Sequence, residues 1–341
     1  MAGTVCKGWS FAGSKAQFSH PSERPHAVWL AERKARAEQL LEDAFVQECT
    51  VGYPVDEKLR GPLEDTHQIV VVKTGPENQG WPITRPRSFT FGINKKRWVW
   101  VGPATDMAIQ EDFDNMFGKS VELTGDVFFQ ASTDQIRQHV FAQLKKRGGA
   151  ADVGQALEMN HSLLLSMLTP GSAQRLDQYE KVVDKKGGIE SGAFLCDCDQ
   201  WPETGCSTCG PWFPCQLTHA NVVSLNMMRP AVGLEYLAAQ GFHVFQDANV
   251  LPAAVSSFMA SLSTERIVSL SGNSMSLPAI SAWFLYVLSN IEPVVQLRVM
   301  PELDMLQKGN SGEFTTPRKA YYGGSDTSQV NTPEQDEIPP H

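Results

Sequence analysis

The sequence predicts an α/β protein with a mixed sheet. Three observations lead to this class: short runs of β-branched and aromatic residues in the first hundred residues, longer stretches with apolar residues at helical spacing, and an apolar run at 277–288. The first pattern is typical of strands and the second of amphipathic helices. The apolar run is shorter than the ~18 residues of a membrane span, so it predicts a buried helix.

The expected elements follow in chain order. Residues 1–26 are rich in Gly, Ser and Pro and predict a loop, residues 27–47 predict a helix, and a short strand is expected at 46–49. Strands are also expected at 67–73, 87–93 and 97–101, where β-branched and aromatic residues dominate or alternate. Further helices are expected at 133–147, 154–168, 232–241, 252–260 and 276–290. Residues 196–215 predict an irregular segment, and the polar residues after about 306 predict a disordered tail.

Composition limits the classes of function. The net charge is −9 and the pI is near 5.4. Dedicated nucleic-acid binders usually have a basic balance, so any nucleic-acid contact here must depend on local patches of arginine and lysine. The first residues lack a basic region followed by an apolar one, so no secretory signal is expected. Five of the seven cysteines lie at 196–215, and an odd number without a signal favours a reducing compartment.

A thiol and a carboxyl group are the first candidates for chemistry. Cys6 lies in a loop flanked by Gly and Ser, and a thiolate there can act as a covalent nucleophile. Glu48 follows a helix and a short apolar run, where a strand would end, and can donate a proton to a ring nitrogen. Taken singly, each is also compatible with an ordinary thiol and a surface glutamate.

Two arginines and a polar turn complete the candidates. Arg85 and Arg87 are separated by a proline that keeps the backbone extended, so both are expected on the same side, suited to a carbonyl or phosphate oxygen. Asn273 and Ser274 follow Gly272 and precede the helix expected at 276–290. They are expected either to cap the N-terminus of that helix or to form a turn that binds a small ligand through backbone donors.

The order of these motifs resembles the second half of the cytosine-5 DNA methyltransferase family. The segment VCKGWSFAG at 5–13 resembles the family's catalytic loop, and Glu48 with the two residues after it resembles the Glu-Asn-Val motif. GWPITRPRSFTFGI at 80–93 resembles the Gly-x-Pro-Gln-x-Arg-x-Arg segment. RPAVGLE at 229–235 with Gln-Gly-Phe at 240–242, and then Gly272-Asn273-Ser274 with Pro278, resemble the closing motifs.

The resemblance implies a role for each candidate. Cys6 would attack C6 of a flipped-out cytosine, Glu48 would hold N3 and the exocyclic amine, and Arg87 with Arg85 would contact the O2 side of the base. Asn273 and Ser274 would close the edge of the pocket for S-adenosylmethionine, the implied cofactor. Arg229 and Glu235 would tie the recognition region to the core. A base must leave the stack before a thiol can reach it.

The resemblance also implies a partial, Rossmann-like S-adenosylmethionine-dependent methyltransferase fold with a smaller target-recognition domain. The expected division is a catalytic part at 1–102, a recognition region at 103–228, a return to the core at 229–305 and a tail at 306–341. Val5, Cys49 and Ile83 depart from the family's motifs. The glycine-rich donor-binding turn would precede residue 1, so a separate donor-binding half is an expected partner beside DNA.

A cluster of thiols raises the question of a metal. Cys196, Cys198, Cys206 and Cys209 are candidates for a zinc site, although the first pair has one intervening residue where zinc sites usually have two or more. The alternative, that these thiols bind no metal, is the one adopted.

The sequence therefore predicts a DNA cytosine-5 methyltransferase that uses S-adenosylmethionine. The alternatives are a non-catalytic relative that binds DNA or regulates an active partner, the same chemistry on RNA, and an unrelated cysteine-rich module. The location would be the nucleus in a eukaryote and otherwise the cytoplasm.

Overall fold

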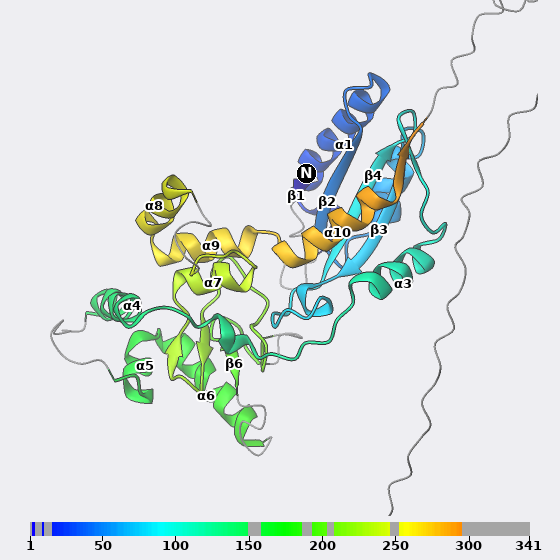
Figure 1. Ribbon diagram of the computed structural model, residues 1–341. Helices are drawn as coiled ribbons and strands as arrows, with labels where there is room; N and C mark the ends of the chain where they lie inside the picture. Colours follow the sequence, from blue (N-terminus) through cyan, green and yellow to red (C-terminus); the bar gives the residue numbers. More distant parts are fainter. Residues whose placement is uncertain are drawn as a thin grey trace, which may run out of the picture. The chain divides into compact units, whose positions relative to one another are not determined.

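The computed structural model (Figure 1) describes residues 2–3, 9, 16–148, 158–185, 193–202, 208–245 and 252–294. All of them belong to one unit, residues 1–294. The structure combines helices and strands, which confirms the expected α/β class. No helix in these ranges is long and apolar enough to cross a membrane. The expected tail lies outside the described residues.

The first sheet has four strands in the order β1-β2-β4-β3. They are β1 (Ala2–Gly3), β2 (Ala44–Thr50), β3 (His67–Thr74) and β4 (Arg87–Asn94). β1 runs parallel to β2, whereas the other neighbours are antiparallel. The strands expected at 67–73 and 87–93 are therefore confirmed.

The helix expected at 27–47 is only partly correct. Helix α1 (Glu23–Glu38) ends earlier, and Leu40 adopts a left-handed backbone with φ +57°. The chain then enters β2, where Phe45 and Val46 are buried. Burial of these two side chains on opposite faces of the sheet outweighs the helical pattern, because alternate strand residues point to opposite faces.

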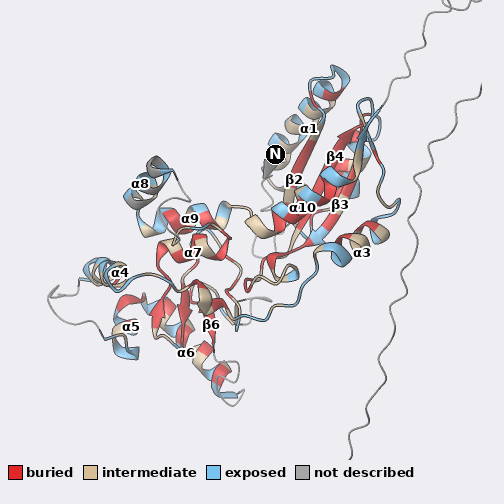
Figure 2. Cartoon of the chain, viewed as in Figure 1, coloured by how far each residue is buried: buried red, intermediate tan, exposed pale blue. Residues whose placement is uncertain are grey.

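Each face of this sheet is covered by helices, and the strands are buried (Figure 2). On one face, Phe89, Phe91 and Ile93 form a cluster with Trp283 of α10 (Leu277–Ser289) and residues of α3 (Asp106–Phe117). On the other, Phe45 and its neighbours pack with residues of the π-helical turn η2 (Asp56–Arg60) and of α2 (Gly61–Leu63). Helix α10 therefore packs against strands that lie within the first hundred residues.

Helix α3 also belongs to this core, although it lies beyond residue 102, where the catalytic part was expected to end. Its Ile109 and Phe113 are buried in the same cluster as α10. The core of the first segment therefore extends at least to Phe117. A short ribbon, β5 (Trp98–Trp100) with β10 (Ile291–Pro293), joins the two ends of this region.

The second sheet forms two hydrophobic clusters with residues of helices α4, α5, α6, α7 and α9. Its order is β7-β6-β8-β9, all antiparallel, with β6 (Leu195–Asp197), β7 (Cys209–Gly210), β8 (Val222–Ser224) and β9 (Arg229–Pro230). The helices are α4 (Thr133–Lys146), α5 (His161–Met167), α6 (Pro170–Lys185), α7 (Gly233–Ala239), α8 (Ala253–Ser261) and α9 (Thr264–Asn273). Short 3₁₀ turns are η1 (Gln17–Ser19), η3 (Pro76–Asn78) and η4 (Gly125–Phe128). The helix expected at 154–168 is shorter, and its first four residues lie outside the described ranges.

Candidate functional site

Glu48 and Arg87 form an ion pair across two neighbouring strands. β2 and β4 are antiparallel, with Glu48 opposite Phe89 and Thr50 opposite Arg87, so Glu48 and Arg87 are diagonal neighbours on one face. Arg87 Nε lies 3.0 Å from Glu48 Oε1, and the two side chains are 17% and 13% exposed. Arg87 also donates to the Pro86 carbonyl at 2.8 Å. The carboxylate therefore has a defined orientation but keeps some access to solvent.

Arg85 connects distant parts of the chain. It is buried, and its guanidinium donates to the Gln216 carbonyl at 3.1 Å, to the Gly272 carbonyl at 3.1 Å and to the Ser274 carbonyl at 2.7 Å. The two arginines therefore have different surroundings, although the sequence treats them as a pair. Arg85 links three backbone segments, whereas Arg87 holds a carboxylate.

Glu77 is a residue that the sequence did not single out. Its Oε2 accepts the backbone N–H of Arg85 at 3.0 Å. Burial raises the pKa of the Glu77 carboxyl above its ordinary value, while the Arg85 N–H and the positive charge of Arg87 act in the opposite direction. A carboxyl group in a loop between a strand and an arginine motif carries no periodic signal, so only the fold identifies it.

Gln216 continues the network from Arg85 into the helices. Its side-chain amide donates to the Tyr236 carbonyl at 2.9 Å, and its Oε1 accepts from Gln240 Nε2 at 2.9 Å and from the Ser271 hydroxyl. All four residues are buried. The Gln-Gly-Phe motif, α7 and α9 are therefore joined to the segment whose carbonyl Arg85 holds.

Arg229 and Glu235 form a buried bidentate ion pair with distances of 2.7 and 2.9 Å. Glu235 also accepts the backbone N–H groups of Ala131 at 2.9 Å and Val232 at 2.8 Å. The pair thus fixes the start of α7 to β9 and to the segment before α4. This agrees with the structural role expected for both residues.

The Gly272-Asn273-Ser274 motif ends α9 instead of starting the next helix. The N-cap of α10 is Ser276, so the N-cap interpretation of 273 and 274 is wrong. Asn273 Nδ2 donates to the Ser269 carbonyl at 3.0 Å, and the Ser274 hydroxyl donates to the Ser271 carbonyl at 2.8 Å. The Ser271 carbonyl also accepts the backbone N–H of Ser274 at 3.1 Å, so these side chains add donors to the last turn of α9.

These contacts test whether the residues fit S-adenosylmethionine. The side-chain donors of Asn273 and Ser274 are engaged on α9, and the carbonyls of Gly272 and Ser274 accept from Arg85. Asn273 and Ser274, as described, therefore do not form a site for the cofactor by themselves. A cofactor role for Asn273 and Ser274 stays a prediction.

Cys6 lies outside the described residues, but its neighbours in the sequence do not. Gly3, three residues earlier, is the register partner of Glu48 in the β1–β2 pair. Trp9, three residues later, packs with Phe18 at 4.9 Å between ring centroids and belongs to the cluster on the α2 side of the sheet. Gly3 thus lies beside Glu48, and Trp9 lies in the cluster on the α2 side of the sheet.

The thiol cluster is partly described. Cys196 and Cys198 are fully buried with their Sγ atoms 4.0 Å apart, and Cys209 is opposite Cys196 in the β6–β7 register. Burial, followed by the neighbouring Cys198, raises the pKa of the Cys196 thiol. Across the described ranges no group of three or more His, Cys, Asp or Glu side chains is arranged to hold a metal ion. Cys206 lies outside those ranges, so the zinc candidates stay a prediction.

Comparisons with known proteins show likenesses to solved methyltransferase structures. No protein-family model and no curated protein matches the chain. The chain is similar to the Dnmt2 methyltransferase of S. pombe (12% identity, 73% of this chain and 67% of that one, TM-score 0.36). It is also similar to a triple mutant of the Spodoptera frugiperda DNMT2 (13%, 72% and 66%, TM-score 0.35). A third is the methyltransferase EhMeth of Entamoeba histolytica (10%, 84% and 76%, TM-score 0.43). The chain thus spans about two thirds of both Dnmt2 structures.

Proposed function

We propose that this chain is the catalytic and target-recognition part of a DNA cytosine-5 methyltransferase. The observation that carries the proposal is the convergence of separated motifs. Arg85 binds the carbonyls of Gly272 and Ser274, and the neighbouring Arg87 holds Glu48 at 3.0 Å. The closing motif and Glu48, which the family resemblance assigns to one reaction, are therefore bound by two arginines that are two residues apart in the chain.

In the proposed reaction, the Cys6 thiolate adds to C6 of the cytosine and makes C5 nucleophilic. Glu48 would hold the N3 edge of the base and supply the proton that the ring nitrogen takes up. Arg87 would position Glu48 through the contact between its Nε and Glu48 Oε1. The β1–β2 register supports joint action, because Gly3 lies opposite Glu48 and precedes Cys6 by three residues.

S-adenosylmethionine is the methyl donor of this reaction. Because the side-chain donors of Asn273 and Ser274 already have partners on α9, we propose that a separate donor-binding half supplies most of its site. Calorimetry of S-adenosylmethionine binding, with this chain alone and with a version extended upstream in its gene, tests this. Binding by the extended version alone is expected, whereas binding by neither would favour a non-catalytic relative that regulates an active partner.

A covalent trap tests the chemistry. The extended chain, incubated with S-adenosylmethionine and an oligonucleotide containing 5-fluorocytosine, is expected to form an adduct that survives denaturing electrophoresis. Cys6→Ser should abolish it, and Cys209→Ser in β7 is the matched control. An adduct that persists in Cys6→Ser would place the nucleophile elsewhere. A DNA and an RNA oligonucleotide of the same sequence, compared side by side, decide between the two substrates.

A further inference from the structure

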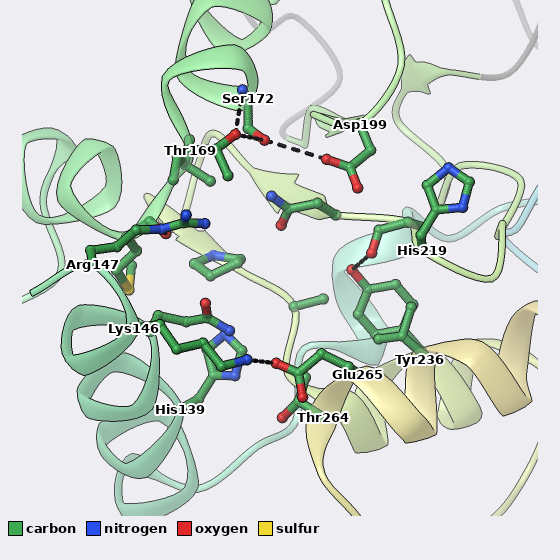
Figure 3. A pocket seen from close by; sticks show the side chains of 18 of the residues that line it. His139, Lys146, Arg147, Thr169, Ser172, Asp199, His219, Tyr236, Thr264 and Glu265 are labelled. Atoms are coloured by element: carbon green, nitrogen blue, oxygen red, sulfur yellow. Dashed lines mark hydrogen bonds and ion pairs between the residues drawn. The ribbon is translucent and has the colours of Figure 1, made fainter.

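A cavity that neither Glu48 nor Arg87 lines lies among α4, α6, α9 and the segment before β8. Its volume is about 390 Å³, within the usual range of small-molecule sites. Figure 3 shows polar side chains from these four elements around one space. Among the described residues, none that is assigned to methyl transfer lines this cavity, so we consider its ligand separately.

One wall is a face of helix α4. His139, Gln143, Lys146 and Arg147 follow at helical spacing and all line the cavity. Lys146 forms an ion pair with Glu265 of α9, and this bond lowers the pKa of the Glu265 carboxyl, so that pair is internally neutralised. Arg147 donates through Nε to the Met167 carbonyl at 3.4 Å, and its guanidinium extends toward the cavity (Figure 3). Arg147 is therefore the cation available to an anionic group.

The opposite wall carries a hydroxyl, a carboxyl and a carboxamide group. The Ser172 hydroxyl is buried and donates to Asp199 Oδ1 at 3.3 Å, and Asn221 also lines the cavity. Burial, with the nearby charge of Asp197, raises the pKa of the Asp199 carboxyl. Burial also lowers the pKa of His139 to about 4, so its ring is neutral at pH 7. A carboxamide such as that of Gln143 or Asn221 presents a donor and an acceptor side by side, as the edge of a nucleobase requires.

The floor between these walls is apolar. Met167, Leu168 and Val268 are buried and line the cavity. A flat heterocycle can cover such a floor while its edge reaches carboxamides and its charged substituent reaches an arginine. Inorganic phosphate would use the arginine alone and would leave the floor uncovered.

We propose that this cavity binds a single nucleotide, with the base over the apolar floor, its edge at Asn221 and Gln143, and the phosphate at Arg147. The inference does not rest on methyl transfer. The ligand can come from two sources, a free nucleoside monophosphate or an unpaired nucleotide of a nucleic-acid strand, and these share the same chemistry.

Calorimetry on the whole chain tests the proposal with AMP, GMP, CMP and UMP, the four matching nucleosides, and inorganic phosphate. Saturable binding of at least one monophosphate, tighter than its nucleoside, is expected. Absence of monophosphate binding at millimolar concentration would overturn the proposal, as would displacement by inorganic phosphate at equal concentration.

Variants locate the site. Arg147→Gln should weaken monophosphate binding by roughly 10- to 100-fold, the effect of losing a hydrogen bond to a charged group, and leave nucleoside binding unchanged. Asn221→Ala should weaken the binding of both the monophosphate and the nucleoside. Lys145→Gln removes the same charge from the neighbouring, exposed position, which does not line the cavity, and is the matched control. An equal loss in Lys145→Gln would show a general charge effect and refute the site.

A single-stranded oligonucleotide separates the two sources. If it displaces the monophosphate from the unmodified chain and binds Arg147→Gln more weakly, the natural ligand is a nucleotide of a strand. If it neither displaces the monophosphate nor responds to the substitution, the ligand is the free nucleotide. Both results require the monophosphate binding that the first experiment measures.

Discussion

Arg85 and Arg87 should respond in opposite ways to the same substitution by methionine. Arg85 is 3% exposed and donates three hydrogen bonds to backbone carbonyls. Methionine keeps much of the buried stem but removes every donor. A carbonyl left without its partner costs roughly 1 kcal/mol or more, so Arg85→Met should lower the free energy of unfolding by about 3 kcal/mol.

Arg87→Met is the matched comparison. The Arg87 and Glu48 side chains are 17% and 13% exposed, so water can only partly replace their ion pair, and its loss should cost about 1–2 kcal/mol, less than the loss expected at Arg85. The same change should strongly reduce transfer by the extended chain, because Glu48 loses the group that orients it. Arg85→Met is expected to reduce activity only as far as it reduces the folded fraction.

Urea unfolding followed by tryptophan fluorescence measures the first effect, and single-turnover transfer at a temperature where both variants are folded measures the second. Equal losses of stability would refute the division of roles. A full loss of transfer in folded Arg85→Met would show that Arg85 itself contacts the base.

Four further expectations follow from the contacts described. Glu48→Gln should slow transfer by roughly 10²–10⁴-fold without unfolding the chain, and an unchanged single-turnover rate would remove it from the mechanism. Gly272→Ala should cost about 1–3 kcal/mol in urea unfolding, because its Cβ would lie 2.5 Å from the backbone of the neighbouring segment; Gly171→Ala, with 3.9 Å of clearance, is the control. Burial, with nearby positive charges, lowers the pKa of His67 to about 4. The unfolded chain therefore binds this proton near pH 6.5 and the folded chain does not, so stability should fall as the pH decreases from 6.5 to 4, by up to ~1.4 kcal/mol per pH unit. His67→Gln should flatten that slope, and a parallel curve would contradict it. Truncation after residue 305 should leave the unfolding midpoint unchanged, and a lower midpoint would show that the tail is docked.

The strands of the first sheet were predictable because their signal is local. In β4, Phe89, Phe91 and Ile93 alternate with residues of the other face, and the structure buries them in one cluster. The end of α1 was not predictable in the same way. Leu40 and Leu41 extend the helical pattern, yet they are 45% and 61% exposed. Apolar residues at a suitable spacing indicate a possible face, whereas tertiary contacts decide whether that face is used.

Other elements carried a signal that the sequence analysis did not use. Leu176, Tyr179 and Val183 are spaced as on one face of a helix, and all three are buried in α6. α9 is harder to predict, because only Ile267, Val268 and the polar Ser271 are buried in it. These three residues lie on one face, but a helix of ten residues is too short to be stable alone, so its existence depends on partners elsewhere in the chain.

The candidate site was predictable in its residue types but not in its connections. The motifs indicated Glu48, Arg85 and Arg87. The partners of Arg85 are carbonyls 131, 187 and 189 positions away, and every residue type has a carbonyl. No pattern of side chains could therefore predict them, and the same holds for the contact between the Arg85 N–H and Glu77.

The closing motif shows what its residue types contribute. Arg85 binds the main chain at 272 and 274, so neither side chain is needed for that contact. Glycine at 272 is needed for another reason: the backbone of Leu217 and Thr218 lies where a Cβ would be. Serine at 274 supplies a hydroxyl to the last turn of α9. Gly272 thus allows two backbone segments to approach closely, and Ser274 stabilises the end of α9. Together these features place the carbonyls of residues 272 and 274 within hydrogen-bond distance of Arg85. The residues Gly272-Asn273-Ser274, which carry part of the family resemblance, therefore have a structural role here. The proposed chemistry depends on Glu48, Arg87 and Cys6.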